Sequence, residues 1–68
     1  MIYVQSSNLS AVEYDPTRMA LRILFHNNRL YEYHGVHESI YNLLLASASK
    51  GQFFNSHIKN CYPYHRIY

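Results

Sequence analysis

The stretch Met19–His34, which reads MALRILFHNNRLYEYH, decides the fold of this chain. Apolar side chains occupy every second position before the polar break at His26-Asn27-Asn28, and the alternation resumes after it. This spacing places successive side chains on opposite faces of a strand. Asn tolerates the positive φ that a tight hairpin turn requires. The stretch therefore predicts a β-hairpin whose first strand has Met19, Leu21, Ile23 and Phe25 on its more apolar face.

The residues before the hairpin predict further extended structure. Residues 9–14 alternate in the same way and predict a strand, while residues 2–5 suit either a short edge strand or an ordered lead-in. Asp15-Pro16-Thr17-Arg18 separates this strand from the hairpin, because Pro fixes φ and Asp bonds nearby backbone. Three strands joined by short turns predict an antiparallel meander.

The periodicity changes from two to 3.6 after Gly35, which ends the third strand. Apolar residues recur at helical spacing between Glu38 and Ser49, and Glu38 suits the positive end of a helix dipole. We expect the helix to end at Lys50 and Gly51, because a cation there lies near the last helical carbonyls and glycine is free to adopt a left-handed conformation. We expect this helix to cover the sheet.

A short second helix is expected over residues 52–59, where Phe53, Phe54, His57 and Ile58 would share one side. Pro63 disfavours helix for the residue before it. The tail, residues 64–68, has no clear period and suits either an added extended segment or a frayed end. The predicted class is α+β: a three-stranded antiparallel meander, with an additional N- or C-terminal edge strand left open, covered by one long and one short helix.

Length and composition limit the class of protein. Sixty-eight residues predict one domain, 1–68, and a hydrophobic share of 49% supplies a core. The single cysteine, Cys61, excludes an intramolecular disulfide and a cysteine-rich zinc site. No run approaches the roughly 20 apolar residues of a membrane span, and the N-terminal residues resemble no signal peptide. We expect a cytoplasmic protein without membrane association, and a net charge of +2 is only a weak basic bias.

No catalytic or cofactor motif is found. The four carboxylates form no recognisable acid/base pair, and neither a P-loop nor a nucleophile elbow is present. The five histidines match no zinc spacing, so we expect solvent-facing or capping roles for them. His34 and His37 flank Gly35-Val36 and are the pair placed to approach one another. The expectation is a protein that is not an enzyme, with no cofactor and no metal.

The aromatic and basic residues of the hairpin form the first candidate binding site. Tyr31 and Tyr33 share one face of their strand, with Arg22 on the neighbouring strand. The two rings are core if the helix covers that face, and a platform on which bases stack if it covers the other. A slip of one residue in the hairpin register exchanges the two outcomes.

A second candidate site lies where the second helix begins. Free backbone amides, the hydroxyl of Ser49 and the charge of Lys50 beside Gly51 suit a phosphate, and the segment extends to Asn55. Lys59 and Arg66 would extend the positive surface. Ordinary capping explains Ser49 and Gly51 equally well.

Several motifs in order resemble the KTSC domain family: Val4-Gln5-Ser6-Ser7, Val12-Glu13-Tyr14-Asp15, Tyr31-Glu32-Tyr33, Gly35-Val36, the segment from Ser49 to Asn55, and Ile58-Lys59. The resemblance runs from about Val4 to Tyr62. The family is named for a C-terminal segment of some lysyl-tRNA synthetases and also occurs as small bacterial and phage proteins. It implies a small cytosolic module, for which RNA binding has been suggested, and it brings no catalytic residues.

Two positions depart from the family pattern. His37 stands where the family usually has Pro, which loses the fixed φ of a first helical position, and Ser47 stands where Ala is frequent. We interpret both as tolerated variation at the helix ends, and no ligand role is carried over from the family for this region.

Two functional hypotheses follow. The first is a non-enzymatic module that binds RNA or a phosphate-bearing nucleotide. The second is a protein-interaction module or small phage-type inhibitor that docks a Tyr-rich surface, since Tyr and Arg are favoured at interfaces. A variant of both is a self-associating protein that sequesters a nucleotide between subunits. The candidate ligand-binding residues are Tyr31, Tyr33, Arg22, Ser49, Lys50, Gly51, Asn55, Lys59 and Arg66.

Overall fold

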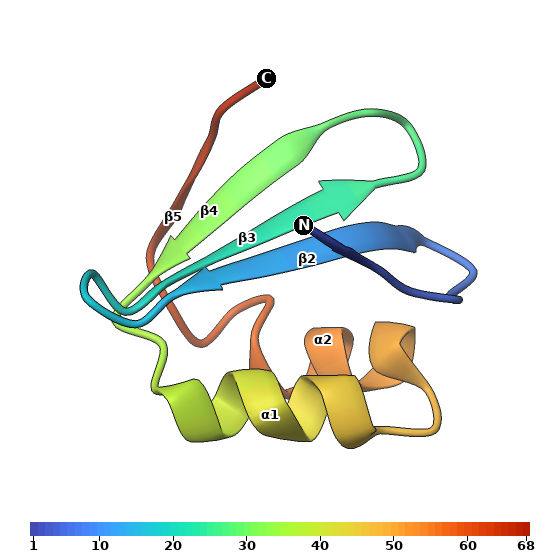
Figure 1. Cartoon of the computed structure of the whole chain (residues 1–68). Helices are drawn as coiled ribbons and strands as arrows, with labels where there is room; N and C mark the ends of the chain where they lie inside the picture. The colour runs from blue at the N-terminus through green and yellow to red at the C-terminus, as the bar shows by residue number, and fades with distance from the viewer.

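The computed structural model describes residues 1–68 and contains one antiparallel sheet with two helices on one of its faces (Figure 1). The elements are β1 (Ile2–Tyr3), β2 (Leu9–Asp15), β3 (Ala20–Phe25), β4 (Leu30–His34), α1 (Glu38–Ala46), α2 (Lys50–His57) and β5 (Tyr64–Arg66). The strand order is β1-β2-β3-β4-β5. The α+β class is confirmed, but a three-stranded meander is wrong, because both terminal segments join the sheet as edge strands.

The β3–β4 hairpin forms as predicted. Asn28 has φ of 65°, and the backbone N–H of Phe25 donates to the carbonyl of Arg29 at 2.9 Å. The register pairs Leu21 with Tyr33 and Ile23 with Tyr31, so these four side chains share one face. Met19 is not part of the strand. It lies in the preceding turn with φ of 50°.

A bulge in β2 changes which of its side chains enter the core. The register shifts between Leu9 and Ala11, so Leu9 pairs with Phe25 while Val12 pairs with Ile23. An inserted residue reverses the alternation locally. Leu9 and Val12 therefore both face the helices, and both are fully buried.

The first helix ends earlier than the sequence predicts. It stops at Ala46, where the hydroxyl of Ser47 donates to the carbonyl of Leu44 at 2.8 Å. The predicted stop at Lys50-Gly51 is wrong, because these residues begin α2, whose N-terminal amide at Gln52 donates to Ser49 Oγ at 3.3 Å. The helices have nine and eight residues, so the expected long and short pair is also wrong.

Gly51 is closely packed against the Asn8 side chain. A Cβ at this position would lie 2.6 Å from Asn8 Oδ1, and its φ is not in the left-handed region. The small residue lets the start of α2 approach the β1–β2 turn. Of the four residues expected on one side of the second helix, Phe54 and Ile58 are buried, Phe53 is half-buried and His57 is exposed.

The core lies between the sheet and the helices. It consists of nine buried residues: Leu9, Val12, Leu21, Ile23, Tyr33, Val36, Leu44, Phe54 and Ile58. Tyr14 connects β2 to α1, because its ring stacks on Tyr41 with centroids 5.1 Å apart and its hydroxyl donates to the carbonyl of Val36 at 2.6 Å. Neither helix has the length and apolar character needed to cross a membrane.

The C-terminal tail is ordered along β4. Tyr64 pairs with Tyr33, His65 with Glu32 and Arg66 with Tyr31. The backbone N–H of Ile67 donates to the carbonyl of Leu30 at 2.7 Å, which extends the ladder. The strand alternative for the tail is the one that the structure adopts.

Candidate functional site

A pocket of about 300 Å³ opens beside β4, between the β3–β4 turn and the C-terminal end of α2. Residues from seven segments meet there, and the turns β1–β2 and β3–β4 contribute because they lie at the same end of an antiparallel meander. The lining consists of Asn8, Phe25, Asn27, Arg29, Tyr31, Tyr33, Phe54, Asn55, Lys59, Asn60 and Tyr64.

Aromatic rings form one wall of this pocket. Tyr31 and Tyr33 are nearly parallel with centroids 6.5 Å apart, and Tyr64 from β5 lies 5.6 and 5.3 Å from them. Phe54 contacts Tyr33 edge-on at 5.6 Å. Such offset and edge-to-face arrangements stabilise aromatic pairs. The wall is therefore held in place by its own ring contacts.

The rest of the lining is polar and carries only positive charge. Arg29 and Lys59 are exposed, four asparagine residues also line the pocket, and no carboxylate does. Amide groups both donate and accept hydrogen bonds. The arrangement suits a ligand with a flat ring, polar edges and a negative charge.

Tyr33 has a strongly shifted acidity. Its side chain is 3% exposed, and burial, with further contributions from Tyr64 and Tyr31, raises its pKa to about 12. Because this folded-state pKa lies above the ordinary value of 10, the neutral phenol contributes to the free energy of unfolding. That contribution is complete below pH 10 and is lost as pH rises through 12.

We expect the wild-type protein to lose about 2 kcal/mol of unfolding free energy from Tyr33 ionisation by pH 11.5. Urea unfolding at pH 9 and pH 11.5 measures this loss, and Tyr33→Phe should reduce it. Tyr3, which is 77% exposed, provides the control, because Tyr3→Phe should keep the wild-type pH dependence. An equal pH dependence in Tyr33→Phe and the wild type would contradict the assignment.

The structure brings together only some of the residues predicted from the sequence. Tyr31, Tyr33, Asn55 and Lys59 line the pocket, with the tyrosines on the helix-covered face. Of the two alternatives left open for these rings, the structure has the one in which the helices cover them: Tyr33 belongs to the core, and Tyr31 is half-buried beside it.

The other predicted residues lie elsewhere. Lys50 Nζ donates to the carbonyl of Ser47 at 3.1 Å, and Ser49 caps α2, so the capping explanation holds for this junction. Gly51 is buried against Asn8, and Arg66 is exposed on β5 without lining the pocket.

Arg22 points to the opposite face of the sheet. Its Nε donates to Glu32 Oε2 at 2.7 Å, while Arg18 Nη2 donates to Glu32 Oε1 at 2.9 Å. The hydrogen bond from Arg22, together with Arg18, lowers the pKa of the Glu32 carboxyl against the opposing effect of its burial. Arg22 is therefore part of an ion-pair network and not of the pocket.

Sequence reasoning missed most of the polar lining. Asn8 and Asn27 lie in turns that an antiparallel meander places at the same end of the sheet. The predicted strand order could therefore have brought these two residues together. Asn60 and Tyr64 had no such signal, because the path of the chain after α2 was not predicted.

Comparison with known proteins gives consistent matches over most of the chain. The KTSC domain model matches residues 5–62. An uncharacterised protein from Stutzerimonas stutzeri is 36% identical over 67 residues, which cover 97% of this chain and 94% of that protein. A lysine–tRNA ligase from Nostoc sp. is 32% identical over 63 residues, which cover 93% of this chain but only 11% of the ligase.

A solved structure matches the fold closely. The crystal structure of a KTSC domain protein from Yersinia pestis superposes with a TM-score of 0.94 at 33% sequence identity. The match covers 97% of this chain and 93% of the other. The family match and this likeness agree, and the chain belongs to the KTSC domain family.

Proposed function

We propose that this chain is a non-enzymatic binding module for RNA or a phosphate-bearing nucleotide, and that the ligand occupies the pocket beside β4. The observation that carries the proposal is the lining itself, in which an aromatic wall faces asparagine amides and two cations without any carboxylate. A base stacked on a Tyr ring contributes about 1–3 kcal/mol. Arg29 and Lys59 would pair with phosphate oxygens.

Size and lining chemistry favour a small or single-stranded ligand. The volume of about 300 Å³ is at the lower end of the range for small-molecule sites, which suits one base or one mononucleotide. The matching segment in a protein named as a lysine–tRNA ligase supports RNA as the ligand class.

Charge reversal at Lys59 should weaken binding strongly. Lys59→Glu places a carboxylate in a pocket that has none, so we expect the affinity for a labelled single-stranded RNA to fall at least about tenfold. Fluorescence anisotropy at two salt concentrations measures it, and the wild-type affinity should fall with added salt. Because Lys59 is exposed, the variant should unfold within about 0.5 kcal/mol of the wild type.

Lys50→Glu is the matched control. It makes the same charge change on α2 but lies outside the pocket lining. Equal weakening by both variants would mean that the loss of affinity comes from the change in net charge and not from the pocket. Absence of wild-type binding to RNA and to free nucleotides at low salt would refute the proposal.

The protein-interaction alternative is less favoured by the distribution of exposed side chains. Tyr3 lies on β1 and Tyr64 on β5, which are the two opposite edges of the sheet, while Leu43 lies on α1. Interface hot spots cluster in one patch. Size-exclusion chromatography with light scattering tests both this alternative and nucleotide sequestration between subunits, since each requires a complex larger than one chain.

A further inference from the structure

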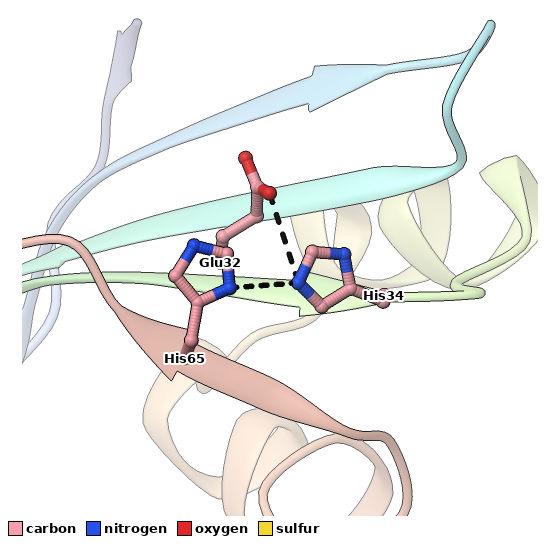
Figure 2. A group of neighbouring side chains, drawn as sticks. All are labelled: Glu32, His34 and His65. Atoms are coloured by element: carbon pink, nitrogen blue, oxygen red, sulfur yellow. Dashed lines mark hydrogen bonds and ion pairs between the residues drawn. The ribbon is translucent and has the colours of Figure 1, made fainter.

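We propose that Glu32, His34 and His65 form a binding site for a divalent transition-metal ion such as Zn²⁺, on the face of the sheet opposite the pocket. The three side chains project from two neighbouring strands toward a common point (Figure 2). One ligand atom from each lies within 4.8 Å of the other two. The site is independent of the proposed nucleotide pocket, because it shares no residue with it.

The backbone ladder places these ligands. Glu32 and His34 are two residues apart on β4 and therefore share a face, while His65 on β5 pairs directly with Glu32. The positions of the three Cα atoms are thus set by strand pairing. A site built on paired strands is positioned more precisely than one built on loops.

The distances suit a small tetrahedral ion. His34 Nε2 lies 2.9 Å from His65 Nδ1 and 3.7 Å from Glu32 Oε1. Bonds of about 2.0–2.1 Å at tetrahedral angles separate ligand atoms by about 3.3 Å, and the two measured distances bracket that value. Two imidazoles and a carboxylate are a ligand set typical of zinc, with a position left for water.

The neighbouring arginines define how the ion would bind. Arg22 holds Glu32 Oε2, which leaves the carboxylate oriented while Oε1 faces the histidines. Arg18 donates to Oε1 at 2.9 Å and to Oε2 at 3.5 Å, and its side chain is 53% exposed, so water can replace the carboxylate as its partner when an ion takes Oε1. The ion therefore competes with Arg18 and keeps Arg22 as a supporting partner of its carboxylate ligand.

The pairing differs from what the sequence suggested for the histidines. His34 contacts His65 across the β4–β5 ladder, with ring centroids 5.0 Å apart, and His37 is not part of the cluster. His65 lies beyond the residues 5–62 that the family model matches. The site is therefore proposed for this chain and depends on its C-terminal strand.

Calorimetric titration of the untagged protein with ZnCl₂ tests the proposal. We expect one equivalent to bind, His34→Gln and His65→Gln each to weaken the affinity at least about tenfold, and Arg18→Ala to tighten it. His37→Gln is the matched control, since it removes an exposed histidine three positions from His34, and it should bind as the wild type does.

A second measurement does not depend on the variants folding. Adding Zn²⁺ to the wild-type protein should shift the imidazole NMR resonances of His34 and His65 while those of His26, His37 and His57 stay in place. Co²⁺ should give the visible absorption of a tetrahedral complex. Unshifted His34 and His65 resonances, or equal weakening by His37→Gln and His65→Gln, would overturn the proposal.

Discussion

Replacing Leu44 by Ala is expected to lower the free energy of unfolding by about 3 kcal/mol, which is a large part of the stability of a 68-residue domain. Leu44 is the only buried residue of α1, and it is 0% exposed within the core beneath the sheet. The substitution removes its apolar contacts and leaves a cavity in the core between α1 and the sheet. Urea unfolding followed by far-UV circular dichroism measures the loss.

Leu43 provides an adjacent control. Its side chain is 54% exposed on the same helix, so Leu43→Ala should change the unfolding free energy by no more than about 0.5 kcal/mol. Both substitutions change helix propensity equally, because both replace Leu by Ala. Similar losses in the two variants would mean that α1 does not pack on the sheet through Leu44.

Replacing Glu32 by Gln is expected to cost about 2 kcal/mol at neutral pH. Glu32 is 1% exposed, and its two oxygens accept hydrogen bonds from Arg18 and Arg22. Gln keeps the shape of the side chain but removes its charge. Both arginines then lose their ionic partner, and a polar amide remains buried in its place. We place the value below that of a fully buried pair because both arginines reach solvent.

The Glu32→Gln measurement is made by urea unfolding in the presence of EDTA, so that bound metal does not contribute. Glu13→Gln is its control, because Glu13 lies opposite Arg22 in the same row of the sheet but is 46% exposed. Its loss should stay within about 0.5 kcal/mol. Equal losses for the two variants would show that burial adds nothing to the Glu32 network.

The elements with strong periodicity were the ones that sequence reasoning placed correctly. The β3–β4 hairpin and the start of α1 follow from spacings of two and 3.6 and from local turn and charge signals. The end of α1 was misplaced, because the Ser47 hydroxyl binds the Leu44 carbonyl and stops the helix before Lys50. A short polar residue within an apolar stripe does not reveal this bond in advance.

The candidate sites depended on pairings between distant segments. The pocket needed Asn8, the β3–β4 turn and the chain after α2 at one end of the sheet. The histidine cluster needed β5, whose three residues carry no periodic pattern in the sequence that predicts pairing with β4. Neither arrangement follows from local spacing.

The sequence by itself determined the α+β class, the hairpin and the existence of two helices, because alternation and helical spacing act through neighbouring residues. Only the tertiary structure decided that Tyr31 and Tyr33 face the helices, that the two termini become edge strands, and that Glu32 lies beside His65. The physical reason is strand register, since a shift of one residue moves every side chain to the other face. Register is set by contacts between segments far apart in the sequence, such as Glu32 of β4 and His65 of β5, which are 33 positions apart.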